Sequence, residues 1–525
     1  MSLPSINPTK TETWKALEEH FQKIENLQMQ DVFEKDSDRA ERFKIEWQDF
    51  YLDYSKNRIT DETISLLLKL AEEVELKEAI AQQFSGEKIN ETEDRAVLHT
   101  ALRDFENMKP EVKTTLQKMK LFSEEIISGN HKGFTGKGIT DIVNIGIGGS
   151  HLGPEMVVEA LQFYKNHLKI HFIANIDGDD VSEKLKTLNP ETTLFIIVSK
   201  SFTTQETIVN ASFVRDWFLK NASKADIEKH FVAVSTNEKG AKDFGISEEN
   251  IFPMQDWVGG RFSLWSSVGL SICCAVGFKN FEAMLKGAFG MDTHFKNEDF
   301  SKNIPIILAL LSVWYNNFFK AESEAVVPYS QYLNKLVPYL QQAIMESNGK
   351  SIDLNGEKIN YQTGTIVWGN VGSNSQHAYF QLLHQGTKLI PTDFIGFAEP
   401  LAGNTNNHNV LMANYLAQTE ALWEGTHFKT VENPFKIFEG NKPTNSLLIK
   451  RLTPKNLGSL IAMYEHKLFV QGIIWNIFSY DQWGVELGKT VAKGTLNAIE
   501  KNNPEKIENT STINLLKKVF GNKKD

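Results

Sequence analysis

Cysteine is scarce in this chain, which contains two among 525 residues. Cys273 and Cys274 are adjacent within an apolar stretch, so they lack the spaced arrangement of a disulfide framework or a cysteine metal site. We expect both to be small buried core residues, in keeping with a reducing cytoplasm.

Long hydrophobic runs and targeting signals are also lacking. The most apolar segment, Ile306 to Tyr315, is too short to span a bilayer. Met1 to Glu12 has neither the charged start nor the apolar run of a signal peptide. These absences predict a protein that is neither inserted into a membrane nor exported.

The chain has fewer basic than acidic residues. The 56 Lys and Arg residues are outnumbered by 66 Asp and Glu residues, which gives a formal net charge of −10. This balance disfavours a general nucleic-acid-binding surface, so an anionic ligand would have to be held by local donors.

Complete nucleotide-binding fingerprints are missing as well. Gly146 and Gly148 begin a dinucleotide pattern, but its third glycine would fall at His151. The segment HKGFTGKG (131–138) nearly matches a P-loop, yet it ends in Gly138 where Ser or Thr is required. Both departures argue against a nucleotide-dependent enzyme.

The chain does contain an apolar strand that leads into a glycine turn, DIVNIGIGGSHLGP (141–154). Unpaired N–H groups at the start of the following helix, together with the Ser150 hydroxyl, would favour a bound phosphate. An ordinary strand-to-helix turn would also explain the glycines. A similar pattern, WGNVGS (368–373), suggests two related α/β halves.

Strands and helices alternate after this turn, which predicts a parallel sheet with helices on both faces. The strands we expect next lie at residues 170–175, 194–198, 231–235 and 365–368. Helical spacing predicts a helical lead-in over residues 1–125 and a second largely helical stretch over 265–342.

A second donor-rich turn, SKSFTTQET (199–207), follows a predicted strand. Thr203 and Glu206 have the spacing of a capping box, which accounts for part of it. Ligands of open α/β sheets lie beyond the carboxyl ends of neighbouring strands, where both turns would meet. We therefore predict a site for a small phosphate monoester. The polar residues of the turn that a cap leaves unexplained are Ser199, Lys200, Ser201 and Thr204.

Two charged residues lie in unusual surroundings. Arg261 follows two glycines among aromatic residues, where burying an unpaired guanidinium is costly, so we favour a site role over a surface salt bridge. Glu346 ends an apolar, helical segment and is a possible general base. From the residues alone, an ordinary helix end at Asn348 and Gly349 is the simpler interpretation.

The segment QHAYFQLLHQG (376–386) predicts a helix with His377 and His384 on one polar face. The two histidines would be about 10 Å apart along the axis, too far to share one metal easily. We take His377, at the helix start, as the catalytic candidate and His384 as a surface residue. Lys489, near an aromatic residue and two glycines, is by itself an ordinary solvent-exposed lysine.

Together these motifs resemble the glucose-6-phosphate isomerase family, over roughly Pro8 to Ala498. Ser201 stands where threonine is commoner in that family, and it keeps the hydroxyl. The segments that carry the resemblance are NETEDRAVLHTALR, NIGIGGSHLGP, SKSFTTQET, DWVGGRFSLWS, MESNGK, NSQHAYFQLLHQGTK and YDQWGVELGK.

The resemblance implies an aldose–ketose isomerase of glycolysis and gluconeogenesis that interconverts glucose 6-phosphate and fructose 6-phosphate through ring opening and a cis-enediol. Glu346 would transfer the proton between carbons 2 and 1, and Arg261 would stabilise the charge developing on the intermediate. His377 and Lys489 would handle ring opening, with Glu206 orienting His377. The implied substrate-binding residues are Gly149, Ser150, Ser199, Lys200, Ser201, Thr204, Gln342 and Gln482.

The implied fold class is α/β, with two α-β-α sandwich domains of the sugar-isomerase (SIS) type. We expect a helical N-terminal segment at 1–125, a smaller domain at 126–290, a larger domain at 291–500 and a C-terminal arm at 501–525. The family is dimeric, so His377 would reach the site of the neighbouring subunit. No metal, organic cofactor, nucleic acid or membrane is implied.

A non-catalytic sugar-phosphate sensor is the main alternative. It would keep the phosphate-binding turns but would not need Glu346, Arg261, His377 and Lys489, so the presence of this set favours an enzyme. A nucleotide-dependent oxidoreductase is disfavoured by His151. Turnover of fructose 6-phosphate would separate the enzyme from the sensor.

Overall fold

The computed structural model describes residues 2–426, 431, 433–500, 507 and 509–520. The chain divides into two compact units, Met1–Ser479 and Tyr480–Asp525. The second unit therefore begins earlier than the arm predicted at 501–525, of which residues 501–506, 508 and 521–525 lie outside the described residues. It contains η16 (Trp483–Val485), α20 (Glu486–Glu500) and α21 (Thr510–Phe520).

The first unit contains a five-stranded parallel sheet in the order β4-β3-β5-β6-β7. Every residue of β5 is buried, which requires cover on both faces of the sheet. The α/β class and the strands expected here are confirmed. Their bounds are β3 (Asp141–Ile145), β4 (Lys169–Ile173), β5 (Thr193–Val198), β6 (Phe231–Val234) and β7 (Ile251–Phe252).

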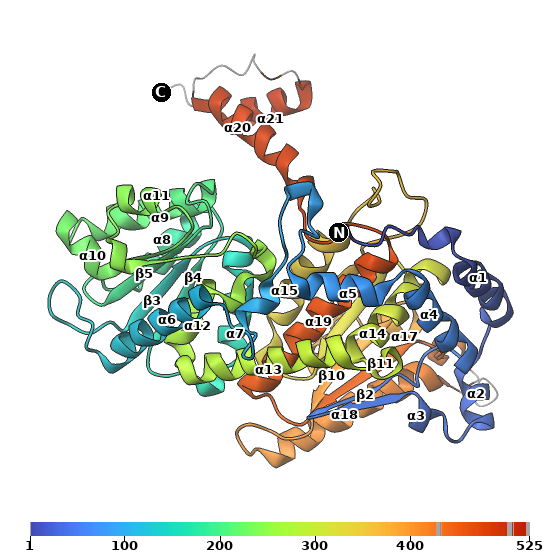
Figure 1. Cartoon of the computed structure of the whole chain (residues 1–525). Helices are drawn as coiled ribbons and strands as arrows, with labels where there is room; N and C mark the ends of the chain where they lie inside the picture. The colour runs from blue at the N-terminus through green and yellow to red at the C-terminus, as the bar shows by residue number, and fades with distance from the viewer. Residues whose placement is uncertain (1, 427–430, 432, 501–506, 508, 521–525) are drawn as a thin grey trace. The chain divides into compact units, whose positions relative to one another are not determined.

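Helices supply that cover. Figure 1 shows α8 and α9 on one side of β3, β4 and β5, with α6 and α12 on the other. On the first side, alternate strand residues such as Val143, Phe195 and Phe231 form one apolar core with Phe218 of α9. The helices around this sheet are α6 (Pro110–Ser128), α7 (Leu152–Ala160), α8 (Gly178–Lys186), α9 (Gln205–Phe218), α10 (Ile227–His230), α11 (Glu238–Phe244) and α12 (Leu270–Val276).

A six-stranded sheet in the order β1-β2-β11-β10-β8-β9 forms the second half of the same unit. Strands β8, β9, β10 and β11 are parallel to one another. The hairpin β1-β2 extends the sheet through β2, which pairs antiparallel with β11. The bounds are β1 (Lys44–Trp47), β2 (Phe50–Asp53), β8 (Ser323–Pro328), β9 (Ile366–Trp368), β10 (Thr392–Phe397) and β11 (Thr444–Ile449).

Two predictions of helical structure need correction at this sheet. The lead-in at 1–125 contains the hairpin β1-β2, and the stretch 265–342 contains β8. The hairpin escapes sequence reasoning because its turn contains Gln48, at a φ of 49°, in place of the glycine that usually marks such a turn. The strand predicted at 365–368 is confirmed as β9.

Helix α19 (Pro454–Ile474) runs through the middle of this half, and every residue in it except Lys455 is buried. It packs against α13 (Phe278–Asn297) and α14 (Ile304–Val313). The other helices of the first unit are α1 (Glu12–Ile24), α2 (Met29–Lys35), α3 (Arg39–Arg42), α4 (Asp61–Glu73), α5 (Leu76–Ser85), α15 (Leu336–Leu340), α16 (Gly372–Gln376), α17 (Phe380–Gln385) and α18 (Thr405–Glu424).

The two sheets agree with the expected pair of α/β halves. The five parallel strands lie within 126–290, and the four parallel strands of the larger sheet lie within 291–500. Residue 290 falls inside the single helix α13, so this domain boundary stays a proposal.

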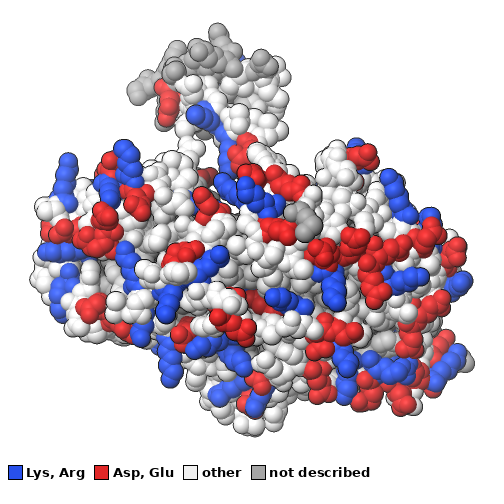
Figure 2. Space-filling view, in the orientation of Figure 1, with Lys and Arg blue, Asp and Glu red and all other residues white. Residues whose placement is uncertain are grey.

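The buried cysteines and the distribution of charged side chains can be compared with the sequence analysis. Cys273 and Cys274 are free and fully buried, as predicted. Acidic and basic side chains are interspersed over the face shown in Figure 2. Among the helices of the described chain, none combines the length and apolar character needed to cross a bilayer.

Candidate active site

The glycine turn after β3 is packed against the loop that carries Arg261. Gly148 has a φ of +61°, which favours glycine, and Gly148–Ser150 forms the short helix η4. A Cβ added at Gly149 would lie 1.9 Å from the carbonyl oxygen of Gly260. The turn therefore needs glycine for close backbone contact, and that contact brings it to Arg261.

The turn after β5 lies at the same edge of the sheet, because β3 and β5 are paired in parallel. Gly146 packs the first turn against the end of β5, since an added Cβ would meet the Val198 carbonyl at 3.0 Å as well as Ser150 Cβ of its own turn at 2.8 Å. Ser199 Oγ donates to Thr204 Oγ1 at 3.3 Å. The two donor-rich turns lie at one edge of the sheet, as predicted, and their role in binding a phosphate stays a prediction.

The capping-box interpretation of the second turn is wrong. Thr204, not Thr203, is the residue preceding α9, and its side chain makes no cap hydrogen bond. Thr203 Oγ1 instead donates to Ser201 Oγ at 2.7 Å, inside the turn. The hydroxyls are thus gathered around the turn itself and are not used to begin the helix.

The side chain of Lys200, in the second turn, is held by two backbone carbonyl groups near the Arg261 loop. Its Nζ donates to the carbonyl oxygens of Asp256 at 2.9 Å and Val258 at 3.3 Å. Burial lowers the pKa of Lys200, and the positive charge of Arg95 lowers it further. The ammonium group therefore lies in partly desolvated surroundings between the second turn and the Arg261 loop.

Arg261 lies in η8 (Gly260–Trp265) and is 3% exposed, so a surface salt bridge is not its role. Its Nε donates to Ser347 Oγ at 2.7 Å, and its Nη2 donates to the Ser479 carbonyl at 2.7 Å. Its Nη1 lies 3.7 Å from Glu346 Oε2. The guanidinium is fixed next to the carboxylate that we considered as a base.

Glu346 closes a π-helical turn, η13 (Gln341–Glu346), that continues α15. Single π-helical turns occur frequently at functional sites. The Glu346 side chain is 21% exposed, and within the described residues its buried Oε2 accepts no hydrogen bond. Gln342 of the same turn faces η4, because a Cβ at Gly148 would lie 3.1 Å from its Nε2. This geometry favours a reactive carboxylate over an ordinary helix end.

The segment 376–386 is not one helix as predicted. It forms α16 and α17, separated at His377–Tyr379, and Tyr379 has a φ of −139°, outside the helical region. His377 caps the end of α16 and is exposed, and its side chain makes no hydrogen bond or ion pair with any described residue. His384 is not a free surface residue, since its Nε2 lies 2.9 Å from Gln418 Oε1.

Three further predicted residues, Glu206, Gln482 and Lys489, lie on other segments of the chain. Glu206 lies half-buried in the first turn of α9. Gln482 and Lys489 belong to the unit Tyr480–Asp525. Lys489 is exposed on α20, where its Nζ donates to Glu486 Oε1 at 2.7 Å, so this part of the prediction stays a proposal.

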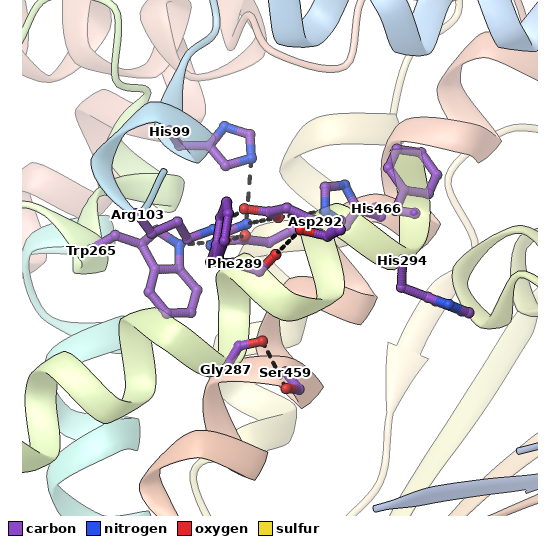
Figure 3. A network of polar contacts seen from close by, with 12 residues as sticks. His99, Arg103, Trp265, Gly287, Phe289, Asp292, His294, Ser459 and His466 are labelled. Atoms are coloured by element: carbon purple, nitrogen blue, oxygen red, sulfur yellow. Dashed lines mark hydrogen bonds and ion pairs between the residues drawn. The ribbon is translucent and has the colours of Figure 1, made fainter. Parts of the chain in front are cut away.

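A buried charge network, which sequence reasoning missed, includes Arg103 and Asp292 and reaches Trp265 at the end of η8, as Figure 3 shows. Arg103 binds both carboxylate oxygens of Asp292 and one of Glu465, all at 2.8 Å. Trp265, the last residue of η8, donates its indole N–H to the other Glu465 oxygen at 2.8 Å. Charged residues on three segments thereby fix one end of η8. The only sequence signal was Arg103 at the end of NETEDRAVLHTALR.

A separate cavity of about 540 Å³ lies beyond β8 and β10. Tyr329, Ser373, Glu399 and His408 are among its lining residues, and among the described residues that line it there is no lysine or arginine. A phosphate dianion requires charge-assisted donors, so this cavity is less suited to a sugar phosphate than the turns around Lys200.

Comparison with known proteins agrees with this geometry. A family model described as phosphoglucose isomerase matches residues 53–516. The chain is 60% identical to a glucose-6-phosphate isomerase of Christiangramia forsetii, with 98% of this chain and 99% of the relative covered. A crystal structure of a glucose-6-phosphate isomerase from Chlamydia trachomatis superposes with a TM-score of 0.87 at 32% identity, covering 98% of this chain and 99% of that one.

A hypothetical protein from Thermus thermophilus shares the fold. Its crystal structure gives a TM-score of 0.67 at 22% identity, and the match covers 85% of this chain and 99% of that chain.

Proposed function

The chain belongs to the phosphoglucose isomerase family, and from this premise we propose which residues perform its reaction. It is an aldose–ketose isomerase that interconverts glucose 6-phosphate and fructose 6-phosphate, a step of glycolysis and gluconeogenesis. The residue roles, the subunit arrangement and the compartment given below are proposals.

The phosphate binds between the two hydroxyl-rich turns at the edge of the smaller sheet. Gly149 and Ser150 hold one side of it. The other side is formed by Ser199, Lys200, Ser201 and Thr204. Support comes from the packing of the first turn against the end of β5, where the second turn begins, and from the position of Lys200, which would exchange carbonyl acceptors for a dianion.

Glu346 is the base that moves the proton. The observation that carries this role is its buried Oε2, which accepts no hydrogen bond from the described residues and lies 3.7 Å from Arg261 Nη1. The carboxylate takes the proton from carbon 2 of the open-chain aldose and returns it at carbon 1 through a cis-enediol. Arg261 stabilises the negative charge that develops on the intermediate oxygen.

Ring opening precedes this step and involves His377 and Lys489, with Glu206 orienting His377. Gln342 and Gln482 position the sugar. We infer that the enzyme is a homodimer in which His377 enters the site of the partner subunit. The exposure of His377 and its lack of a side-chain partner among the described residues support this arrangement.

The enzyme acts in the cytoplasm in this proposal. Two adjacent, unpaired thiols at Cys273 and Cys274, both fully buried, fit a reducing compartment.

Conversion of fructose 6-phosphate to glucose 6-phosphate without added metal tests the proposed site. We expect wild-type turnover, and we expect Glu346→Gln to abolish it while sugar-phosphate binding persists. Glu399→Gln is the matched control, because Glu399 lines the separate cavity. Activity that survived Glu346→Gln but was lost in Glu399→Gln would move the active site to that cavity.

A further inference from the structure

We propose that Asn348, two residues beyond Glu346, is a positioning residue that fixes the guanidinium of Arg261 through Ser479. The proposal rests on the role given to Arg261 above, and it adds residues that act without touching the sugar. Asn348 is fully buried in the first unit, although the segment around it ends a helix.

Both polar atoms of the Asn348 side-chain amide make hydrogen bonds. Its Nδ2 donates to the Leu468 carbonyl at 2.9 Å and to Gln471 Oε1 at 3.3 Å, both on α19. Its Oδ1 accepts from Ser479 Oγ at 2.7 Å. Asn348 therefore ties the turn after Glu346 to the most buried helix of the molecule and also to Ser479.

Ser479 is the link to Arg261. Its carbonyl oxygen accepts from Arg261 Nη2 at 2.7 Å, while its hydroxyl is held by Asn348. The position of this hydroxyl is also fixed by packing, because a Cβ added at Gly472 would lie 1.9 Å from Ser479 Oγ. The acceptor for Arg261 is thus set by a side-chain hydrogen bond and a close backbone contact.

The opposite end of the chain of hydrogen bonds is anchored in the larger sheet. Gln471 Nε2 donates to Ser312 Oγ at 2.8 Å, and Ser312 Oγ donates to Glu324 Oε2 on β8 at 2.8 Å. Glu324 is paired with the buried Lys467 of α19. Because every member is buried, losing one hydrogen bond leaves its partner unsatisfied and free to shift.

Loss of the Asn348 hydrogen bonds should affect the proton-transfer step more than substrate binding. Arg261 contacts Ser347, Ser479 and Glu346, whereas the phosphate-binding hydroxyls lie on other turns. A displacement of the guanidinium by about 1 Å lowers a rate by about 10²-fold when it misaligns a reacting group. Loss of Asn348 should therefore lower kcat and change KM little.

The test uses the full-length enzyme with Asn348→Ala, and Asn303→Ala as the control. Asn303 is another buried amide, which donates to the Phe295 carbonyl at 2.9 Å, away from the site. We expect Asn348→Ala to reduce kcat about 10²-fold with little change in KM for fructose 6-phosphate. Asn303→Ala should lower the melting temperature and leave kcat unchanged.

Two ligands separate positioning from a general structural effect. Glucitol 6-phosphate has the phosphate but no carbonyl, while an acyclic hydroxamate sugar phosphate mimics the planar enediolate. Asn348→Ala should bind the first as wild type does and the second more weakly. The proposal would be overturned if Asn348→Ala bound both ligands as tightly as wild type does, or if it kept the wild-type kcat.

Ser479→Ala provides a second test that removes only the hydroxyl. It should reproduce the loss of kcat and of hydroxamate affinity, and it decides the question if Asn348→Ala does not fold. If wild-type enzyme failed to turn over fructose 6-phosphate, the proposed function itself would fall. If Arg261→Ala lost activity while both positioning variants kept it, this inference alone would fall.

Discussion

At the scale of single residues, the site depends on a few polar groups whose surroundings change their ordinary behaviour. Lys200 is a surface residue type that lies partly buried, Arg261 is buried next to a carboxylate, and Glu346 exposes one edge of its side chain. Desolvation strengthens the attraction of the two cations, Lys200 and Arg261, for an anionic substrate. These three residues carry the account of binding and proton transfer.

We expect Lys200 to make the enzyme sensitive to alkaline pH. Burial disfavours its ammonium form and lowers its pKa in the free enzyme, and only the ammonium form attracts the phosphate. We therefore expect kcat/KM to fall, as pH rises, at a lower pH than an ordinary lysine would give. Lys200→Arg keeps its charge over this range, so the fall should move to higher pH.

A pH series of kcat/KM measures this effect, with Lys242→Arg as the exposed control. An unchanged alkaline limb in Lys200→Arg would show that another group titrates there.

Residue types alone led to much of this candidate site, whose roles stay predictions. The hydroxyls after β5 and the glycines after β3 were found because backbone needs and side-chain donors show in the sequence. The residues alone marked Glu346 as a possible base, but only the family resemblance favoured that role over an ordinary helix end. A π-helical turn has no spacing signal that separates it from such an end. Asn348 and Ser479 were missed, since a buried hydrogen bond between distant residues leaves no local pattern.

At the scale of elements, the site is a junction of short segments. The turns η4, η8 and η13 meet at the edge of the smaller sheet, and α19 and α13 support them from the larger half. Sequence reasoning missed the hairpin β1-β2 and strand β8 because their structure depends on distant parts of the chain. Pairing of β2 with β11 and of β8 with β10 outweighs the local helical spacing.

Arg103 should be a major determinant of how these elements hold together. Arg103→Ala leaves Asp292 and Glu465 buried without their partner, which we expect to cost about 3–5 kcal/mol of folding free energy. Chemical denaturation followed by circular dichroism measures the loss. Arg42→Ala is the control, because Arg42 pairs with Asp36 and Asp61 at the exposed surface and should change stability little. Equal denaturation midpoints for the two variants would contradict this role.

At the scale of the whole molecule, the proposed role of His377 needs two copies of the chain. Glu346 and Arg261 are assembled within the first unit, but His377 is turned to solvent without a described side-chain partner. A symmetric dimer would let each subunit supply His377 to the other. Sequence reasoning could reach this arrangement only through the resemblance, because nothing local to a histidine shows which subunit it serves.

Mixed dimers test the shared site. Glu346→Gln and His377→Ala should each be inactive alone, yet a heterodimer of the two contains one site with both native residues. Coexpression with two affinity tags isolates that heterodimer. A randomly assorted mixture should regain about a quarter of wild-type activity, since half of the dimers carry one intact site of two. A mixture as inactive as its components would place His377 in its own subunit's site.

The central claim is that Glu346 carries a proton between carbons 1 and 2, and solvent exchange observes that transfer directly. Fructose 6-phosphate incubated with enzyme in deuterated water is followed by nuclear magnetic resonance. We predict deuterium at one of the two prochiral positions on carbon 1 of the remaining fructose 6-phosphate and at carbon 2 of the glucose 6-phosphate formed. Glu346→Gln should show no exchange even where substrate remains bound. Exchange that continued in Glu346→Gln at the wild-type rate would contradict the account.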